Sequence, residues 1–185
     1  MMLATLLAVA TAAAPAPTPK KPAAAAPAAQ AASLDLVPAF IGACMNPGPD
    51  ADKIRAVVVK AGGQAAPQNA QSATAAAPVQ AYIFQNGGLP YSVVFDRTGT
   101  CSIVSGRIDV DETRSSLDRL VIGSSKVFDI SQTEAKSHVE GETVLIEYML
   151  SSKNKNGGLR LTLSRVVRNG QRPSFFLTRR MVAGK

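Results

Sequence analysis

The last third of the chain contains three segments in which apolar and polar residues alternate, at 143–151, 159–168 and 174–182. Successive side chains of a strand point to opposite faces, so this pattern predicts three strands that each bury one face. The sequences KNGG at 155–158 and NG at 169–170 separate the segments and favour tight hairpins. This part of the chain therefore predicts an antiparallel sheet.

The middle of the chain predicts further strands. AYIF at 81–84, YSVVF at 91–95 and the segment 100–107 are rich in β-branched and aromatic residues and are separated by glycine-containing turns. We expect a three-stranded meander here. Residues 111–122 have the apolar spacing of a short helix, and residues 126–130 resume an extended pattern.

Two helices are predicted before the first of these strands. Ser33 and Asp50 are residue types that cap helix N-termini, and apolar side chains follow each of them at helical spacing. Residues 46–49 (NPGP) end the first helix, and Gly62 with Gly63 ends the second. Residues 64–78 lack periodicity, and we expect a mobile surface loop.

Together these elements predict an α+β fold. We expect two N-terminal helices packed on a mainly antiparallel sheet of six or seven strands, with one short helix between sheet segments. The chain shows no internal sequence repeat, which argues against a propeller or a solenoid.

The N-terminus has the features of an export signal. Residues 3–14 are an apolar run of aliphatic and small residues, which is too short to span a bilayer. We therefore expect a signal peptide at 1–14 with an uncertain cleavage site, a disordered tether rich in Pro, Ala and Lys at 15–32, and a single domain at 33–185. The run has no basic residue before it, and the alternative is a low-complexity cytosolic N-terminus. The expected location is periplasmic or secreted in a bacterium, with no transmembrane span after cleavage.

Cys44 and Cys101 are the only cysteines of the chain. In an exported domain an isolated pair favours a disulfide, which would join the end of the first helix to the meander. The alternative is a pair of buried, unbonded thiols. A redox enzyme is disfavoured because the chain has no Cys-x-x-Cys motif.

Charge is distributed unevenly along the chain, whose net charge is +7. Residues 109–147 contain nine acidic residues, whereas residues 148–185 contain nine basic residues and no acidic ones. In the segment 159–168, alternation places Arg160 on a polar face with Thr162 and Ser164, and the next segment can add Thr178 and Arg180. The predicted anion-binding residues are Lys153, Lys155, Arg160, Arg168, Arg172 and Arg180.

A cationic face of this kind predicts an anionic partner in the bacterial envelope, either an envelope component or an acidic protein surface. Nucleic acid is a weaker expectation because few aromatic residues accompany the charges. The alternatives are a solvated face that aids solubility, or a structural or inhibitory component of an envelope assembly.

The sequence favours a non-enzymatic role. It has no motif for nucleophilic catalysis or nucleotide binding, and its single histidine, His138, excludes a metal site built from several histidines. We predict no cofactor and no metal. The enzymatic alternative is a hydrolase in which two of the carboxylates Glu140, Glu142 and Glu147 act as acid and base.

Overall fold

The computed structural model describes residues 34–67, 79–86, 89–132, 141–153, 157–168 and 171–183. The predicted signal peptide and tether, residues 68–78 of the predicted loop, and the residues His138, Glu140 and Lys155 lie outside this described part of the chain. Predictions about them stay predictions.

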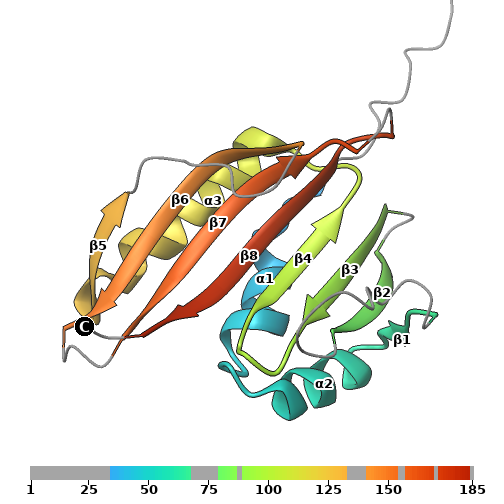
Figure 1. Ribbon diagram of the computed structural model, residues 1–185, viewed down its shortest axis with the longest axis horizontal. Coiled ribbons are helices and arrows are strands. Elements are labelled where there is room, and N and C mark those ends of the chain that lie inside the picture. The colour runs from blue at the N-terminus through green and yellow to red at the C-terminus, as the bar shows by residue number, and fades with distance from the viewer. Residues whose placement is uncertain are drawn as a thin grey trace, which may run out of the picture. The chain divides into compact units, whose positions relative to one another are not determined.

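The described residues form one antiparallel sheet of eight strands in the order β1-β2-β3-β4-β8-β7-β6-β5 (Figure 1). Each strand pairs with its neighbour in the chain, except that the central pair joins β4 to β8. The strands are β1 Gln64–Ala65, β2 Gln80–Asn86, β3 Leu89–Phe95, β4 Cys101–Ser105, β5 Phe128–Gln132, β6 Glu142–Ser152, β7 Gly158–Val166 and β8 Ser174–Val182.

The helices of the described residues pack on one face of this sheet, and Figure 1 shows α1 and α3 behind it. The helical elements are α1 Val37–Phe40, which continues as the π-helix η1 Ile41–Met45, α2 Ala51–Lys60, α3 Val110–Gly123 and the 3₁₀-helix η3 Ser124–Lys126. The helical elements α1, η1 and α2 precede strands β1 to β4, and α3 with η3 precedes strands β5 to β8. Each half of the domain therefore has helical elements followed by four strands, and the two halves meet at the β4–β8 pair.

The α+β class and the antiparallel sheet are confirmed, but the predicted number of strands was too low. The additional strand is β1, where Gln64 pairs with Ile83 and Ala65 with Tyr82 at the start of the predicted loop. Two residues carry no alternation, so only the neighbouring strand β2 identifies this segment as a strand. The first helix also differs from the prediction, because α1 is only four residues long before the π-helical turn begins.

The caps of the longer helices follow from the sequence. The Asp50 carboxylate accepts hydrogen bonds from the backbone N–H groups of Asp52 and Lys53, at 2.9 and 3.2 Å. Asp109 accepts one from the backbone N–H of Glu112 at 2.9 Å. Each aspartate satisfies donors that the first turn of a helix leaves unpaired. These contacts confirm the predicted N-terminus of α2 and explain why acidic residues gather at the start of α3.

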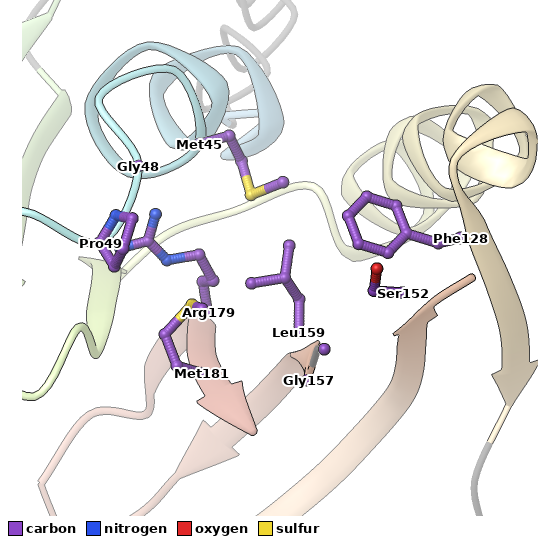
Figure 2. A pocket seen from close by; sticks show the side chains of 10 residues that line it. Met45, Gly48, Pro49, Phe128, Ser152, Gly157, Leu159, Arg179 and Met181 are labelled. Carbon is purple, nitrogen blue, oxygen red and sulfur yellow. The ribbon is translucent and has the colours of Figure 1, made fainter. Parts of the chain in front are cut away.

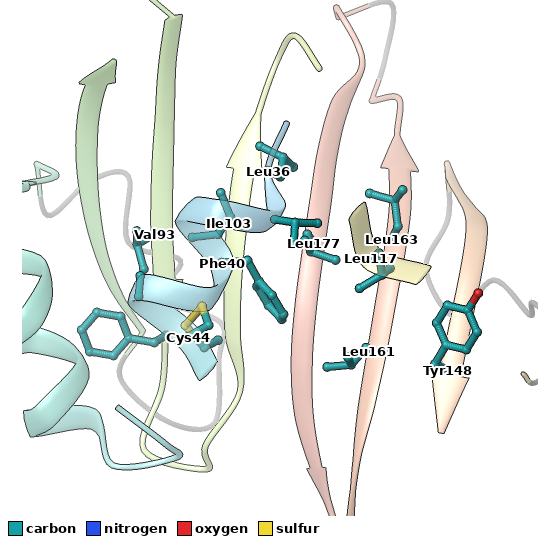
Figure 3. Packing of buried hydrophobic residues seen from close by; sticks show 14 of the residues in the cluster. Leu36, Phe40, Cys44, Val93, Ile103, Leu117, Tyr148, Leu161, Leu163 and Leu177 are labelled. Atoms are coloured by element: carbon teal, nitrogen blue, oxygen red, sulfur yellow. A yellow bond between two sulfur atoms is a disulfide. The ribbon is translucent and has the colours of Figure 1, made fainter. Parts of the chain in front are cut away.

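The hydrophobic core lies between the helices and the face of the sheet that they cover, which we call the covered face (Figure 3). Phe40 of α1, Ile54 of α2 and Leu117 of α3 are fully buried there. The strands contribute alternate residues, as the period-two pattern predicts for a half-buried sheet. These buried strand residues include Val93, Phe95, Ile103, Ile146, Leu150, Leu161, Leu163 and Leu177.

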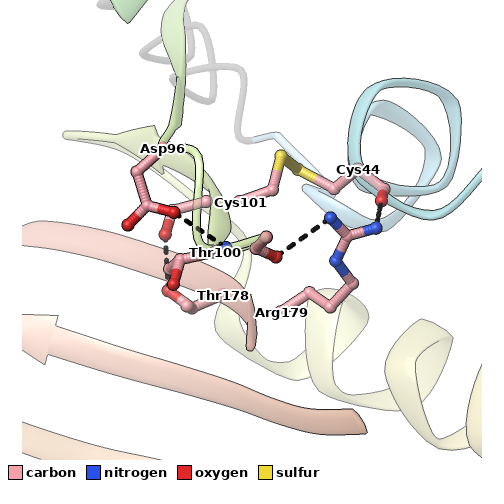
Figure 4. Close-up of a disulfide and its surroundings, with 8 residues drawn as sticks. Cys44, Asp96, Thr100, Cys101, Thr178 and Arg179 are labelled. Atoms are coloured by element: carbon pink, nitrogen blue, oxygen red, sulfur yellow. Dashed lines mark hydrogen bonds between the residues drawn. A yellow bond between two sulfur atoms is a disulfide. The ribbon is translucent and has the colours of Figure 1, made fainter. Parts of the chain in front are cut away.

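Cys44 and Cys101 form the predicted disulfide, with 5.6 Å between their Cα atoms (Figure 4). Cys44 lies in η1 and Cys101 is the first residue of β4, and both are fully buried. The bond therefore ties the N-terminal helical segment to the centre of the sheet across 57 residues of chain.

Candidate functional site: the open face of the sheet

The second face of the sheet carries none of the described helices, and we call it the open face. Residues next to the buried leucines of β7 and β8 point to it, because alternate side chains of a strand lie on opposite faces. They are Arg160, Thr162 and Ser164 on β7 and Thr178 and Arg180 on β8. This is the set of residues that the sequence assigned to a polar face.

The strand register arranges these side chains in rows. Arg160 is directly opposite Arg180, and Thr162 is directly opposite Thr178. The Thr178 hydroxyl lies 2.8 Å from the hydroxyl of Ser102 on β4, which extends the second row. Two guanidinium groups thus lie beside a row of hydroxyl groups on three adjacent strands.

Glu147 of β6 is the acidic neighbour of this cluster. Its side chain is only 8% exposed although it lies on the open face, opposite Thr162. The Thr162 hydroxyl donates a hydrogen bond to one carboxylate oxygen at 3.2 Å, and the Arg160 Nε atom lies 3.9 Å from the other. That Nε atom is buried and donates no hydrogen bond to a described residue. Glu147 therefore offsets the charge of Arg160 without satisfying its Nε donor.

Arg180 makes no ion pair with any described residue. It shares a pocket of about 120 Å³ with Arg160, Thr162 and both Glu142 and Glu147. This part of the open face combines two cations, hydroxyl groups and two carboxylates on the β6 side. Its chemistry suits an anion that lies over β7 and β8, because the carboxylates are confined to β6.

A second group of cations lies where β7 turns into β8. Arg168 and Arg172 line a hollow of about 130 Å³ next to Phe176, and Arg172 also lines a neighbouring pocket with Arg107. None of these arginines forms an ion pair with a described residue. Arg160 lies six residues before Val166, the last residue of β7, which at a strand rise of about 3.3 Å per residue corresponds to roughly 20 Å, and Arg168 follows two residues after the strand ends. The open face thus has a cationic group toward each end of the β7–β8 hairpin.

The structure places four of the six predicted anion-binding residues on this hairpin in two separate pairs, Arg160 with Arg180 and Arg168 with Arg172. Lys153 has a different role, because its Nζ atom donates hydrogen bonds to the backbone oxygens of Ser125 and Lys126 at 2.9 and 3.4 Å. An ammonium group there satisfies carbonyls at the end of a helical segment. Lys155 lies outside the described residues.

The most deeply buried arginine, Arg179, is not among the residues predicted to bind an anion. Its side chain is 2% exposed, points to the covered face and donates hydrogen bonds to the backbone oxygens of Cys44 and Gly99 (Figure 4). Burial lowers the pKa of Arg179. The available signal was its place in the alternation of β8, where position 179 falls on the same face as Leu177 and Met181.

In the described part of the chain, no group of three or more His, Cys, Asp or Glu residues is arranged to hold a metal ion. None of the helices among these residues is long and apolar enough to cross a membrane. The chain matches no protein-family model, no curated protein and no solved structure.

Proposed function

We propose that this chain is an exported, non-enzymatic binding or adaptor domain that engages an anionic envelope component or an acidic protein surface through its open face. The observation that carries the proposal is the placement of Arg160 directly opposite Arg180, beside the hydroxyl row of Thr162, Thr178 and Ser102. Export rests on the apolar N-terminal run and the isolated cysteine pair.

The arginine pair is unfavourable without an anion. Like charges directly opposite each other on neighbouring strands destabilise a sheet. Glu147 offsets part of this repulsion through Arg160, but it leaves Arg180 without an acidic partner among the described residues. A carboxylate or phosphate over β7 and β8 would pair with both guanidinium groups, which form fork-shaped hydrogen bonds with planar oxygen pairs. The nearby hydroxyl groups supply further donors.

The two cationic groups also indicate the shape of the partner. They lie roughly 20 Å or more apart along the hairpin, and the residues between them on the open face are Thr162, Ser164, Ser174 and Thr178, with the apolar Val166 and Phe176. An extended anionic chain can reach both groups, whereas a single headgroup contacts only one. The geometry therefore favours a polyanionic polymer or an acidic peptide segment.

The test measures retention of the protein on isolated bacterial envelopes at low ionic strength. Three open-face substitutions, Arg160→Glu, Arg168→Glu and Arg180→Glu, are combined in one variant. The matched control combines Lys53→Glu, Lys60→Glu and Lys126→Glu, which change the net charge equally at exposed sites on helical segments. Electrostatic binding weakens with salt because the Debye length falls from about 30 Å at 0.01 M to about 10 Å at 0.1 M.

We expect the wild-type protein and the control variant to be retained at low salt and released at high salt, and the open-face variant to be lost at both. Equal retention of all three proteins would refute the proposal. Equal loss of both variants would show that net charge, and not the open face, determines retention. Thermal unfolding of each variant checks that the fold is intact.

The pocket on the open face is also the one observation that favours the hydrolase alternative, since it gathers Glu142 and Glu147. Its volume of about 120 Å³ is small beside the range of about 300–1,000 Å³ that is typical of ligand pockets. Glu147 is moreover held by Arg160 and Thr162, an arrangement that fixes a carboxylate in place. The same residues therefore support anion binding better than acid and base catalysis.

A further inference from the structure

Another pocket lies on the covered face, at the end of the sheet where β6, β7 and β8 approach the N-terminal helical segment (Figure 2). Its volume is about 240 Å³, and its lining is mostly apolar. Side chains from η1 and from strands β5 to β8 contribute to it: Met45, Phe128, Ser152, Leu159, Arg179 and Met181, with Pro49 at one side (Figure 2). We call this cavity the Arg179 pocket.

Arg179 gives the pocket a buried positive charge. Two of its donors are used, because Nη1 bonds to the Cys44 carbonyl and Nη2 to the Gly99 carbonyl, the latter at 3.1 Å. The Nε donor is buried and has no hydrogen-bond partner among the described residues, and no described carboxylate forms an ion pair with the guanidinium. Burying an ion without a counter-charge is costly, and a buried charge is normally paired.

The residues around Arg179 show why the sequence holds it there. Cys44 is near the C-terminal end of η1, where backbone carbonyls lack intrahelical partners, and a cation is favourable at that end. Gly99 is in a turn with φ of 86°, and a Cβ atom there would lie 3.0 Å from atoms of both Pro49 and Met181. The two carbonyls fix the guanidinium but bring no negative charge, so the site remains a cation beside apolar walls.

We propose that the Arg179 pocket binds an aliphatic carboxylate, with its carboxylate group toward Arg179 and its chain along Met45, Phe128 and Leu159. This ligand supplies the missing counter-charge and covers apolar surface at the same time. The pocket is slightly smaller than the range of about 300–1,000 Å³ for drug-sized ligands, which suits a single short or medium aliphatic chain.

Two methionines make the pocket adaptable. Met45 and Met181 both line it, and the Met181 side chain is 42% exposed. Methionine is unbranched and flexible, so it can move aside to admit a ligand and then pack against it. Movement of Met181 gives the carboxylate access to the buried Nε atom of Arg179.

The methionines also provide the test. The protein is labelled with ¹³C at the methionine methyl groups and titrated with sodium decanoate. Met45 and Met181 report on the Arg179 pocket, while Met149, opposite Arg160, reports on the open face. We expect the signals of Met45 and Met181 to shift with decanoate concentration while the signal of Met149 stays fixed. Shifts at Met149 alone, or no shifts at millimolar decanoate, would overturn the proposal.

Decanol, the uncharged analogue, tests the role of the charge. A charge-assisted hydrogen bond to a buried group corresponds to about tenfold or more in affinity, so decanol should bind at least about tenfold more weakly. The Arg179→Met variant should lose this preference and bind both molecules equally. Equal binding of both molecules by the wild-type protein would show an apolar cavity without carboxylate recognition.

Two variants keep the proposal testable if Arg179→Met fails to fold. Leu159→Trp fills the pocket from β7 and should weaken decanoate binding by about tenfold or more, whereas unchanged binding would place the ligand elsewhere. The open-face variant with Arg160→Glu, Arg168→Glu and Arg180→Glu should bind decanoate like the wild-type protein. Failure of this proposal and failure of the proposed function are therefore distinguishable.

Discussion

Arg179 and Arg180 are consecutive residues of β8, yet the two faces of the sheet give them opposite surroundings. Arg179 points to the covered face, where it is 2% exposed and bonds to two backbone carbonyls. Arg180 points to the open face, where it is exposed and lies opposite Arg160. The same residue type therefore serves as an internal clamp on one face and as a surface charge on the other. Strand alternation, and not charge, decides between the two roles.

The covered face depends on contacts that converge on one corner of the sheet. Cys101 is directly opposite Arg179 in the β4–β8 pair, and Cys44 supplies both the other sulfur of the disulfide and a carbonyl for Arg179. The open face consists instead of rows of polar side chains, and none of the described helices packs on them. We therefore expect substitutions of the buried contacts on the covered face to change stability, and substitutions on the open face to change retention on the envelope.

The largest effect on stability is expected from loss of the disulfide. The double variant Cys44→Ser and Cys101→Ser releases a loop of 57 residues. In the chain-entropy model this destabilises the domain by about 4 kcal/mol. Urea unfolding of the variant and of the wild-type protein measures the difference. Wild-type protein treated with reductant is the control, and its midpoint should fall toward that of the variant.

A midpoint that is unchanged in both the variant and the reduced protein would show that strand pairing alone holds η1 on β4. The disulfide would then not be the main stabilising contact of the covered face.

The next largest effect on stability is expected at Arg179, and its neighbour Arg180 should show almost none. Arg179→Met removes hydrogen bonds from two carbonyls at the covered face, and an unpaired buried polar group costs about 1–3 kcal/mol. Relief of the buried charge offsets part of this cost, so we expect a net loss of about 2 kcal/mol. Arg180→Met changes an exposed side chain, and the expected change is within about 0.5 kcal/mol.

Thermal and urea unfolding of the two single variants provide the measurement, and each variant is the matched control of the other. Equal destabilisation by both would contradict the assignment of Arg179 as a clamp and Arg180 as a surface charge.

Much of this contrast could be predicted from the sequence, because it rests on local patterns. Alternation predicted strands β6, β7 and β8 and placed Arg160 and Arg180 on one polar face. The Asp50 cap needs only a residue type and its position before an apolar run. The disulfide followed from there being a single possible pair of cysteines.

The remaining features depend on pairings between distant segments. The alternation of β4 and of β8 does not show that they are neighbours at the centre of the sheet, and β1 has no pattern of its own. The roles of Arg179 and Glu147 depend on partners far away in the chain, such as the Cys44 carbonyl and the Arg160 guanidinium. A sequence pattern gives the face of a residue, but not the groups that it meets there.

The smallest expected effect on stability comes from Tyr148 of β6, which faces the covered side of the sheet, whereas its neighbour Glu147 faces the open side. Burial, together with the hydrogen bond that its hydroxyl donates to Asp118 on α3, raises the pKa of Tyr148 to about 12 from an ordinary value of 10.0. Between these values the unfolded chain loses the phenolic proton while the folded domain keeps it. Tyr148 therefore stabilises the fold fully below pH 10, and this contribution declines as the pH rises toward 12.

The measurement is the free energy of unfolding from pH 9 to pH 12 for the wild-type protein and for Tyr148→Phe. The wild-type protein should lose more stability than the variant, by on the order of 1 kcal/mol at pH 11. Tyr91→Phe is the matched control, because burial alone raises the pKa of Tyr91 and its effect should be smaller. Parallel profiles for the wild-type protein and Tyr148→Phe would show that the Asp118 contact does not hold the phenol in its protonated form. A steeper loss of stability in the wild-type protein would show that the hydrogen bond between Tyr148 and Asp118 helps to hold α3 on β6. None of the described helices packs on the open face, so that face has no contact of this kind among the described residues.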